Sequence, residues 1–299
     1  MADQQTTDGL IVVDKAPGMT SHDVVAKCRR IARTRKVGHG GTLDPMATGV
    51  LVVGVGRATR LLTYVVGTDK VYRATIRLGQ STLTDDADGE ITATHPVSVP
   101  QTLVHEQLAA MTGDIDQVPS AVSAIKVNGV RAYKMVREGE TVELAARRVR
   151  IARIDVFDVR QVGDLLDVDV EVACSSGTYI RAIARDLGAA LGVGGHVTAL
   201  RRTAVGGFTL AEAATLEQLA EISQAGGDPV GLPLAQAIAR TMPVRTVDDD
   251  DARILSHGGP LAPAGIPGAY GVLGPDGTAL AVVRESGGRA RPEVVLAPA

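Results

Sequence analysis

The sequence predicts an α+β fold arranged in two domains. Segments with strand patterns and segments with helix patterns mix along the chain without the regular alternation of a parallel α/β fold. A length of 299 residues is typical of about two domains. Residues 244–299 consist of short Val/Leu runs between Pro/Gly turns, the pattern of a small all-β domain. We therefore expect a mixed domain over residues 1–235 and a small all-β domain over residues 244–299.

The composition is that of an ordinary globular protein. Hydrophobic residues make up 45% and charged residues 22% of the chain, and the formal net charge is −3. Any RNA contact must therefore come from local basic patches. Cys28 and Cys174 are too few for a disulfide framework or a zinc site. Because residues 1–7 lack a signal-peptide pattern and no apolar run approaches ~18 residues, we expect a cytoplasmic protein that does not span a membrane.

The N-terminal part of the chain predicts a strand, a helix and a second strand. Residues 10–13 are a short β-type run, and Thr20 or Ser21 can cap a helix that continues to about Arg33. Residues 50–55 have the apolar pattern of a buried strand. The helix region also carries a basic cluster, formed by Lys27, Arg29, Arg30, Arg33, Arg35 and Lys36. This cluster is either a solvated helix face or a surface that contacts phosphates.

The rest of the mixed domain contains segments with the 3.6-residue period of a helix and segments with the two-residue period of a strand. We expect helices over residues 58–66, 104–111 and 178–191, strands over residues 71–78, 167–172 and 200–203, a loop over 192–196, and a short helix opened by the capping box Thr215-x-x-Gln218. The acidic stretch 85–90 lacks the spacing of a calcium loop, so it predicts a tight turn. Residues 120–149, rich in glycine and basic residues, predict either a basic excursion or a strand–helix–strand element.

One dense motif, GHGGTLDPMATG, occupies residues 38–49. Three glycines within four positions allow a sharp turn or a close approach to a ligand, because glycine lacks a Cβ. Pro45 disfavours helical geometry at Asp44 and so holds this single carboxylate between a turn and a stiff joint. A polar turn entering a buried strand is the plainer interpretation. The length and density of the motif favour a site centred on Asp44.

Three further residues are candidates for the same site. Tyr72 lies on a predicted strand, and Tyr179 and Arg181 lie in the first turn of a predicted helix. A cation is unfavourable at a helix N-terminus, so Arg181 needs a nearby carboxylate. An ionised Asp can act as a nucleophile beside an Arg, and tyrosines offer flat faces for an unstacked base. With no metal cluster, P-loop or Ser/His/Asp arrangement in the sequence, covalent catalysis by a carboxylate without a cofactor is the remaining chemistry.

The motif at residues 38–49 resembles the catalytic signature of TruB-type tRNA pseudouridine-55 synthases. The similarity continues, in consistent order, through residues 10–18, 70–73, 85–89, 177–181 and 196–202. The resemblance implies a pseudouridine synthase catalytic domain with a mixed/antiparallel sheet and a small PUA-like C-terminal domain. It also implies an enzyme that isomerises uridine 55 in the T-loop of tRNA to pseudouridine, by base flipping and covalent catalysis by an Asp, without a cofactor or a metal.

The resemblance assigns a role to each candidate residue. It implies that Asp44 is the nucleophile, that Arg181 pairs with it and that Tyr72 packs on the flipped base. His39 would fill the place of the extruded nucleotide, although it could be an ordinary turn histidine. The remaining substrate-binding candidates are Tyr179 and Leu200, which would line the pocket, and Arg147 and Arg148, which would contact RNA. Tyr179 could instead pack inward at a helix start, and Leu200 could be a core leucine.

The expected partner is the T-arm of tRNA, and we expect a monomer without an obligate protein partner. An excursion near residues 121–150 would clamp this arm. Two alternatives remain: a non-enzymatic tRNA-binding or folding protein, and a related synthase that acts on another RNA within a guide-RNA particle. The pair Asp44 and Arg181 favours an enzyme, because binding alone needs neither residue. The absence of long basic tails from the sequence argues against the guide-RNA alternative.

Overall fold

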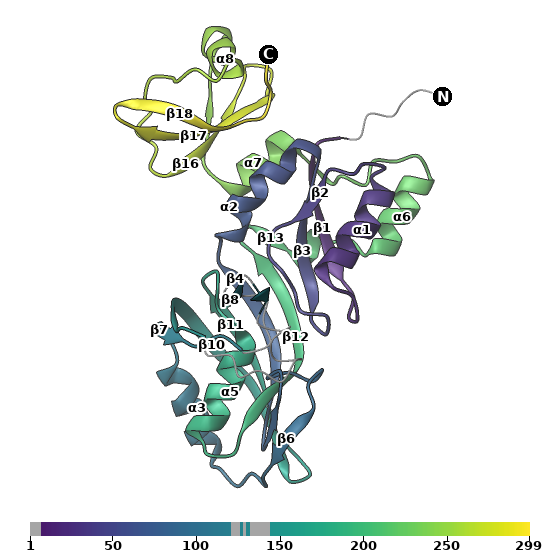
Figure 1. Cartoon of the computed structure of the whole chain (residues 1–299), viewed down its shortest axis with the longest axis vertical. Helices are drawn as coiled ribbons and strands as arrows, with labels where there is room; N and C mark the ends of the chain where they lie inside the picture. The colour runs from purple at the N-terminus through teal and green to yellow at the C-terminus, as the bar shows by residue number, and fades with distance from the viewer. Residues whose placement is uncertain (1–6, 121–125, 128–129, 132–143) are drawn as a thin grey trace. The chain divides into compact units, whose positions relative to one another are not determined.

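The computed structural model shows a chain that folds into two compact units (Figure 1). It describes residues 7–120, 126–127, 130–131 and 144–299. The first unit, called the split unit below, comprises Met1–Asp44, Val50–Val66 and Gly206–Ala299. The second, the central unit, comprises Pro45–Gly49 and Gly67–Val205. In the part of the chain that is described, no helix has the length and apolar character needed to cross a membrane.

The N-terminal part of the split unit confirms the predicted strand–helix–strand order. Its elements are β1 (Gly9–Lys15), α1 (Ser21–Ile31), β2 (Val37–His39), most of β3 (Thr48–Val55), the 3-10 helix η1 (Gly56–Leu61) and α2 (Leu62–Val66). Thr20 caps α1 through a capping box, because its hydroxyl accepts from the Asp23 N–H and the Asp23 carboxylate accepts from the Thr20 N–H. The apolar run of β1 is buried in the core of the unit.

The C-terminal part of the split unit contains helices and a second sheet. Its elements are β13 (Phe208–Thr209), η2 (Leu210–Glu212), α6 (Leu216–Gln224), β14 (Leu232–Pro233), α7 (Leu234–Thr241), β15 (Val244–Thr246), α8 (Asp249–Ser256), β16 (Ala269–Leu273), β17 (Ala279–Ser286) and β18 (Arg289–Val295). The sheet order β15-β16-β17-β18 confirms the predicted C-terminal sheet region. The helix α8 was not predicted. Asp248 caps it by accepting from the Asp251 N–H, and the acidic stretch fills its first turn, where negative charge is favourable.

The last strand, β18, is tied to η1 and α2 within the split unit. Arg57 donates from Nη1 to the Leu296 carbonyl at 2.8 Å, and Arg60 donates to the Val295 carbonyl at 2.6 Å. The Tyr64 hydroxyl donates to the Glu293 carboxylate at 2.8 Å. Burial and this carboxylate raise the pKa of Tyr64 to about 12. The end of the chain therefore contributes partners to the N-terminal part of the same unit.

The central unit is built on a long, mainly antiparallel sheet. Its elements are β4 (Lys70–Leu78), β5 (Gln80–Thr82), β6 (Ile91–Thr94), α3 (Gln101–Ala110), β7 (Gly113–Gln117), β8 (Lys126–Val127), β9 (Val130–Arg131), β10 (Arg147–Val162), β11 (Leu165–Cys174), α5 (Ile180–Ala190) and β12 (Gly195–Val205). The strand order is β12-β4-β11-β10-β7, with every neighbouring pair antiparallel, and the start of β3 pairs parallel with β12. This mixed sheet confirms the predicted α+β class.

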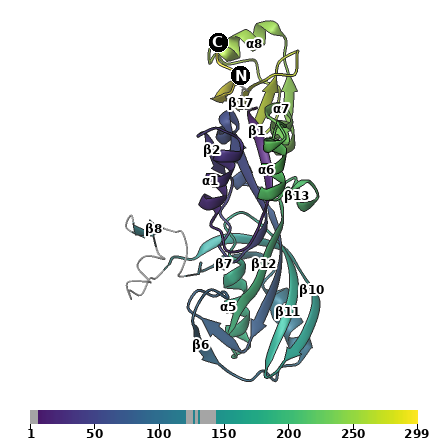
Figure 2. The ribbon, with the colours of Figure 1, turned by 90° about the vertical axis from the view of Figure 1, so that its right-hand side faces the viewer.

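One face of this sheet is buried, and α5 packs against it (Figure 2). Side chains alternate along β4, so Tyr72, Ala74 and Ile76 are buried while their neighbours point to the opposite face. Helix α5 approaches β12 so closely that a Cβ on Gly195 would lie 2.4 Å from the Ala184 carbonyl oxygen. Only glycine therefore fits at this contact.

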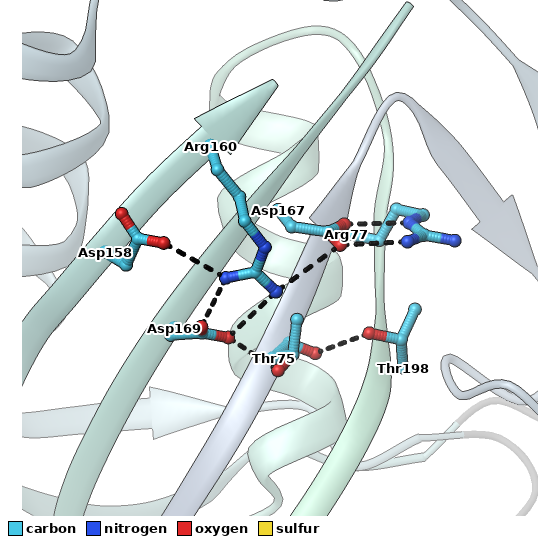
Figure 3. A network of polar contacts seen from close by, with 7 residues as sticks. All are labelled: Thr75, Arg77, Asp158, Arg160, Asp167, Asp169 and Thr198. Atoms are coloured by element: carbon cyan, nitrogen blue, oxygen red, sulfur yellow. Dashed lines mark hydrogen bonds and ion pairs between the residues drawn. The ribbon is translucent and has the colours of Figure 1, made fainter. Parts of the chain in front are cut away.

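The opposite face of the sheet carries a network of ion pairs and hydrogen bonds (Figure 3). Its members are Thr75, Arg77, Asp158, Arg160, Asp167, Asp169 and Thr198. Arg77 binds Asp167 through two bonds of 2.8 and 2.9 Å, and Arg160 bridges Asp158 and Asp169. Because the partners come from neighbouring strands, the network stabilises the register of β4, β10 and β11.

Two predictions for the central unit differ from the structure. The loop expected over 192–196 ends at Gly194, because β12 begins at Gly195. His196 is therefore a buried strand residue, with Nδ1 3.0 Å from the Gln80 carbonyl oxygen. The long strand β10 was not predicted beyond its first residues. Most of the excursion expected near 121–150 falls outside the described residues.

Candidate active site

Asp44 is the last residue of the first segment of the split unit and lies in the irregular stretch after β2. It is half-buried, and the residue before it, Leu43, is buried. The hydroxyl of Ser21, at the start of α1, accepts from the Leu43 N–H at 2.9 Å and lies 3.2 Å from the Leu43 carbonyl oxygen. The capped start of α1 thus holds the main chain one residue before Asp44.

The second half of the motif belongs to the central unit. Gly49 has a φ of +99°, and a Cβ there would lie 2.2 Å from the Arg202 carbonyl oxygen. The start of β3 pairs with β12 at Arg201 and Arg202. Gly49 is therefore required because the backbone of β12 approaches it closely, a contact that the sequence did not predict.

His39 ends β2 and faces Val53 of β3 in the register of the sheet. It is half-buried, and its ring centroid lies 5.4 Å from that of His22 in an edge-to-face arrangement. His39 and Asp44 thus belong to the same unit, five residues apart in the motif. The contact with His22 holds the ring on α1, which the sequence did not predict.

Tyr72 and Leu200 lie on the same face of adjacent strands. Tyr72 on β4 pairs with Arg202 on β12, and Leu200 pairs with Ala74, so Tyr72 and Leu200 occupy diagonal positions. Their relative exposures are 8% and 7%. This is the face against which α5 packs. The structure therefore brings these two predicted residues together on one surface of the sheet.

Tyr179 and Arg181 flank the start of α5. The helix begins at Ile180, later than the start expected near Thr178, because the Thr178 hydroxyl donates to the Ser175 carbonyl instead of capping the helix. Tyr179 is the N-cap residue, and Arg181 is the second helical residue, as predicted for the first turn.

Arg181 is buried against Asp86 within the central unit. Its Nη1 lies 3.2 Å from Asp86 Oδ2 and donates to the Thr84 carbonyl at 2.8 Å, and both charged side chains are 5% exposed. The main chain of this acidic turn bonds to β12, since the Val197 N–H donates to the Asp85 carbonyl at 3.0 Å. The sequence required a carboxylate for Arg181, and Asp86 is one such group.

Asp86 is a residue whose charge the sequence analysis did not use. The sequence of residues 85–90 predicts a tight turn, and the structure does contain a turn there. The signal in the sequence that pointed to such a partner was Arg181, because a cation in the first turn of a helix needs a carboxylate nearby. Nothing local to Asp86 identified it as that partner, because the two residues are far apart in the sequence.

Lys70 and Arg202 are two further buried cations that the sequence analysis did not single out. Lys70 is in register with Cys174 on β11 and donates to the Thr68 carbonyl at 2.5 Å. Burial, followed by the charge of Arg202, lowers the pKa of Lys70 to about 8. Lys70 alternates onto the same face of β4 as Tyr72. The buried face of this sheet is thus more polar near Tyr72 than the sequence predicted.

Arg147 and Arg148 begin β10 and are exposed. Arg147 faces Gln117 of β7 in the register of the sheet, and Arg148 faces Asp116. Arg148 Nη1 lies 3.3 Å from Asp116 Oδ2, with side-chain exposures of 63% and 67%. A pair this exposed is weak, so its arginine can exchange the carboxylate for another anion.

Family models match nearly the whole chain. The model described as the TruB family pseudouridylate synthase N-terminal domain matches residues 29–180. The chain belongs to the TruB family of pseudouridylate synthases. Two further models of the family match the rest: the tRNA pseudouridylate synthase B C-terminal domain at residues 181–238, and the tRNA pseudouridine synthase II C-terminal domain at residues 242–297.

Relatives named tRNA pseudouridine synthase B are similar over their full length. The protein of Arthrobacter sp. (strain FB24) is 56% identical over 302 residues, which covers 97% of each chain. The protein of Mycobacteroides abscessus is 56% identical over 301 residues, covering 100% of this chain and 99% of its own. These relatives confirm the predicted TruB-type family and enzyme class.

Solved structures of the same fold are more distant in sequence. The chain matches one in a Cbf5-Nop10-Gar1 complex at a TM-score of 0.75 and 27% identity, covering 97% of this chain and 85% of that chain. An archaeal box H/ACA sRNP Nop10-Cbf5 complex gives a TM-score of 0.74 at 26% identity, with 98% and 87% covered. These matches confirm the predicted fold class. The individual site roles and the domain limits, 1–235 and 244–299, stay predictions.

Proposed function

We propose that this TruB-family protein converts uridine 55 in the T-loop of tRNA to pseudouridine, with Asp44 as the nucleophile. The observation that carries the proposal is the 56% identity, over 97% of both chains, to a relative named tRNA pseudouridine synthase B. Similarity over the whole length includes the surfaces that select a substrate as well as the catalytic motif. We therefore propose that the substrate is a tRNA, as the name of the relative states.

The proposed reaction is an isomerisation within one nucleotide. The N1–C1′ bond of uridine breaks, the base rotates, and a C5–C1′ bond forms, while C5 loses a proton and N1 gains one. No atom is added and nothing is oxidised, so the scheme needs no cofactor. In the proposal the Asp44 carboxylate acts as a covalent catalyst and Arg181 is its counter-charge. The ion pair of Arg181 with Asp86 supports this role, because it limits the rotamers of the guanidinium.

The other predicted residues have proposed roles in holding RNA. Tyr72 would stack on the flipped base, with Leu200 and Tyr179 lining the pocket, and the shared face of Tyr72 and Leu200 supports this. His39 would fill the place that the flipped nucleotide leaves. The first residues of β10, which include Arg147, would contact phosphates of the T-arm.

The test is single-turnover formation of pseudouridine in a T-arm stem-loop, mapped by base position, with binding measured on the same RNA. Asp44→Asn preserves shape and removes the nucleophile, so we expect normal binding and loss of turnover. Tyr72→Phe keeps the stacking face and removes the hydroxyl, so it separates stacking on the base from any function of the hydroxyl. Asp249→Asn, an exposed residue of α8, is the matched control. Turnover by Asp44→Asn at a rate near that of the parent would refute the nucleophile assignment.

The matches to chains of a Cbf5-Nop10-Gar1 complex and of an archaeal box H/ACA sRNP Nop10-Cbf5 complex favour a second candidate, the predicted alternative of a related synthase that acts on another RNA within a guide-RNA particle. Their identity to this chain is 26–27%, against 54–56% for the relatives named as tRNA enzymes. The same assay separates the candidates. A tRNA enzyme converts the isolated T-arm without added RNA or protein, a guide-dependent enzyme does not, and a pure binding protein binds the stem-loop without converting it.

A further inference from the structure

Gln117 is a buried polar residue that lies outside every motif described above. It ends β7 and is 2% exposed. Its Nε2 donates to the Tyr179 carbonyl at 3.1 Å, and its Oε1 accepts from the Tyr179 N–H at 2.8 Å. One side chain thus binds both main-chain polar groups of the residue that starts α5.

Helix α5 has no side-chain capping bond of its own, unlike α1, α6 and α8. Tyr179 makes no side-chain capping bond, and the Thr178 hydroxyl is directed to Ser175. By contrast, Thr20 and Thr215 cap α1 and α6 with their own side chains. The main chain at the start of α5 is therefore held by a side chain from β7.

The start of α5 decides where two candidate site residues point. Tyr179 is the bonded residue itself, and Arg181 follows two positions later. An α-helix turns by about 100° per residue, so if Gln117 bound the main chain of a neighbouring residue instead of Tyr179, the helix would shift by one residue relative to the sheet and Arg181 would rotate away from Asp86 and from the Thr84 carbonyl. Both of those contacts are short, at 3.2 and 2.8 Å, and they tolerate little rotation.

We propose that Gln117 is a positioning residue for catalysis: its amide fixes the start of α5 and thereby the orientation of Tyr179 and Arg181. This inference rests on the proposed function. The amide suits the role because it donates and accepts at once, whereas an ionised carboxylate only accepts and an apolar side chain does neither.

A second contact of α5 lies beside the first. Arg185 donates from Nη2 to the Val118 carbonyl at 2.7 Å and from Nη1 to the Pro119 carbonyl at 3.4 Å. The residue opposite Gln117 on β10 is Arg147, a predicted RNA contact. Gln117 therefore joins the strand pair that carries this contact to the helix that carries Arg181.

The first test compares turnover with binding for the full chain and a T-arm stem-loop. Gln117→Leu removes both bonds at similar volume. We expect the single-turnover rate to fall roughly tenfold or more while the Kd for RNA changes less than twofold. Gln161→Leu is the matched control, because Gln161 is exposed on β10 and its amide donates to the carbonyl of Gly163, just after that strand. A folded Gln117→Leu protein with a rate within twofold of the parent would overturn the proposal.

The second test uses Gln117→Glu, which remains informative if Gln117→Leu fails to fold. The ionised carboxylate can accept from the Tyr179 N–H but repels its carbonyl, whereas the protonated acid both accepts and donates. Burial raises the pKa of such a carboxyl. We therefore expect the ratio of variant to parent turnover to rise as pH falls from 8 to 5.5. Titratable or charged residues adjoin position 117: Arg147 lies opposite it on β10, Tyr179 is bonded to it through its main chain, and Arg185 donates to the next two carbonyls. The ratio cancels their effect on the parent.

A pH-independent ratio for Gln117→Glu would overturn the proposal. Hydrogen exchange of the Tyr179 amide tests the positioning separately from activity. We expect faster exchange in Gln117→Leu than in the parent, and unchanged exchange in Gln161→Leu. If the parent forms no pseudouridine while this difference in exchange is present, the proposed function fails and the contact itself stands. If exchange is unchanged in Gln117→Leu, the positioning role fails whatever the activity.

Discussion

Arg181 illustrates how a single charge is accommodated at a place that disfavours it. The N-terminus of a helix carries a partial positive charge, which opposes a cation in the first turn. Asp86 supplies the compensating carboxylate from a turn nearly a hundred residues earlier, and both side chains are buried. Removing one partner of such a pair leaves an uncompensated charge, which costs more than the pair itself contributes.

Asp86→Asn tests this pair. We expect the free energy of unfolding to fall by about 3 kcal/mol, because the buried Arg181 loses the carboxylate that lies 3.2 Å from its guanidinium. Turnover should also fall, since the guanidinium loses its fixed orientation, and urea denaturation with single-turnover kinetics measures both. Asp88→Asn, exposed in the same turn, is the control. An Asp86→Asn protein as stable and as active as the parent would exclude a role for the pair.

Arg181→Lys is a separate test at the same residue. It keeps the charge and loses the planar guanidinium fork, so it cannot reproduce the bonds to both Asp86 and the Thr84 carbonyl. We expect turnover to drop at least tenfold, with RNA binding little changed, because binding relies on other cations. Measuring the single-turnover rate and the Kd on one stem-loop checks this. Equal losses in rate and affinity would instead place Arg181 among the RNA-binding residues.

The strand pair β7 and β10 presents exposed arginines at its end. Arg147 and Arg148 begin β10, and their opposite residues on β7 are Gln117 and Asp116. Because both arginines are exposed, they can bind a phosphate without breaking a buried ion pair. Because the net charge of the chain is −3, local clusters such as this one must supply the attraction for RNA.

Replacing Arg147 and Arg148 with Ala should weaken RNA binding and flatten its salt dependence. Each phosphate contact contributes slightly less than about one unit to the slope of log K against log salt. We expect the slope to fall by about one to two units in fluorescence-anisotropy titrations. Asp116→Asn is the matched variant, because it removes the carboxylate beside Arg148 and keeps both arginines. An unchanged slope in the Arg147/Arg148 double variant would show that these arginines do not contact phosphates.

At the scale of the whole molecule, the C-terminal sheet is tied to the N-terminal part of the split unit. Arg57 and Arg60 donate to carbonyls at the end of β18, and Tyr64 donates to Glu293. None of the predicted catalytic residues lies in residues 244–299. The C-terminal region therefore has structural contacts within the unit while the candidate chemistry lies elsewhere.

A chain that ends at Met242, after α7, should keep part of its turnover at saturating RNA and bind tRNA more weakly. Its melting temperature should fall, because Arg57 and Arg60 lose their carbonyl partners. Circular dichroism checks folding, and single-turnover assays with a full tRNA check activity. Arg60→Ala in the full chain is the control, since it removes one tie and keeps the sheet. A folded truncate without any turnover would contradict the predicted domain limits.

Local patterns in the sequence determined much of the secondary structure. The expected cap at Thr20 or Ser21 identified the start of α1, and the capping box Thr215-x-x-Gln218 identified the start of α6, because a cap and its bonded partner lie three residues apart. The alternation over residues 167–172 identified β11, since a half-buried strand has a period of two. These signals depend only on neighbouring residues, so the sequence alone contains them. The family resemblance added the predicted chemistry centred on Asp44.

Only the tertiary structure decided which distant residues meet. Asp86 as a partner of Arg181, and Gln117 as the residue that fixes the start of α5, depend on the order of strands in the sheet. The sequence predicts a helix from about residue 178, whereas α5 begins at Ile180, where the Thr178 hydroxyl bonds to Ser175 and Gln117 bonds to Tyr179. Strand order is a property of the whole chain, because many weak contacts between remote segments together outweigh local preferences of about 1 kcal/mol.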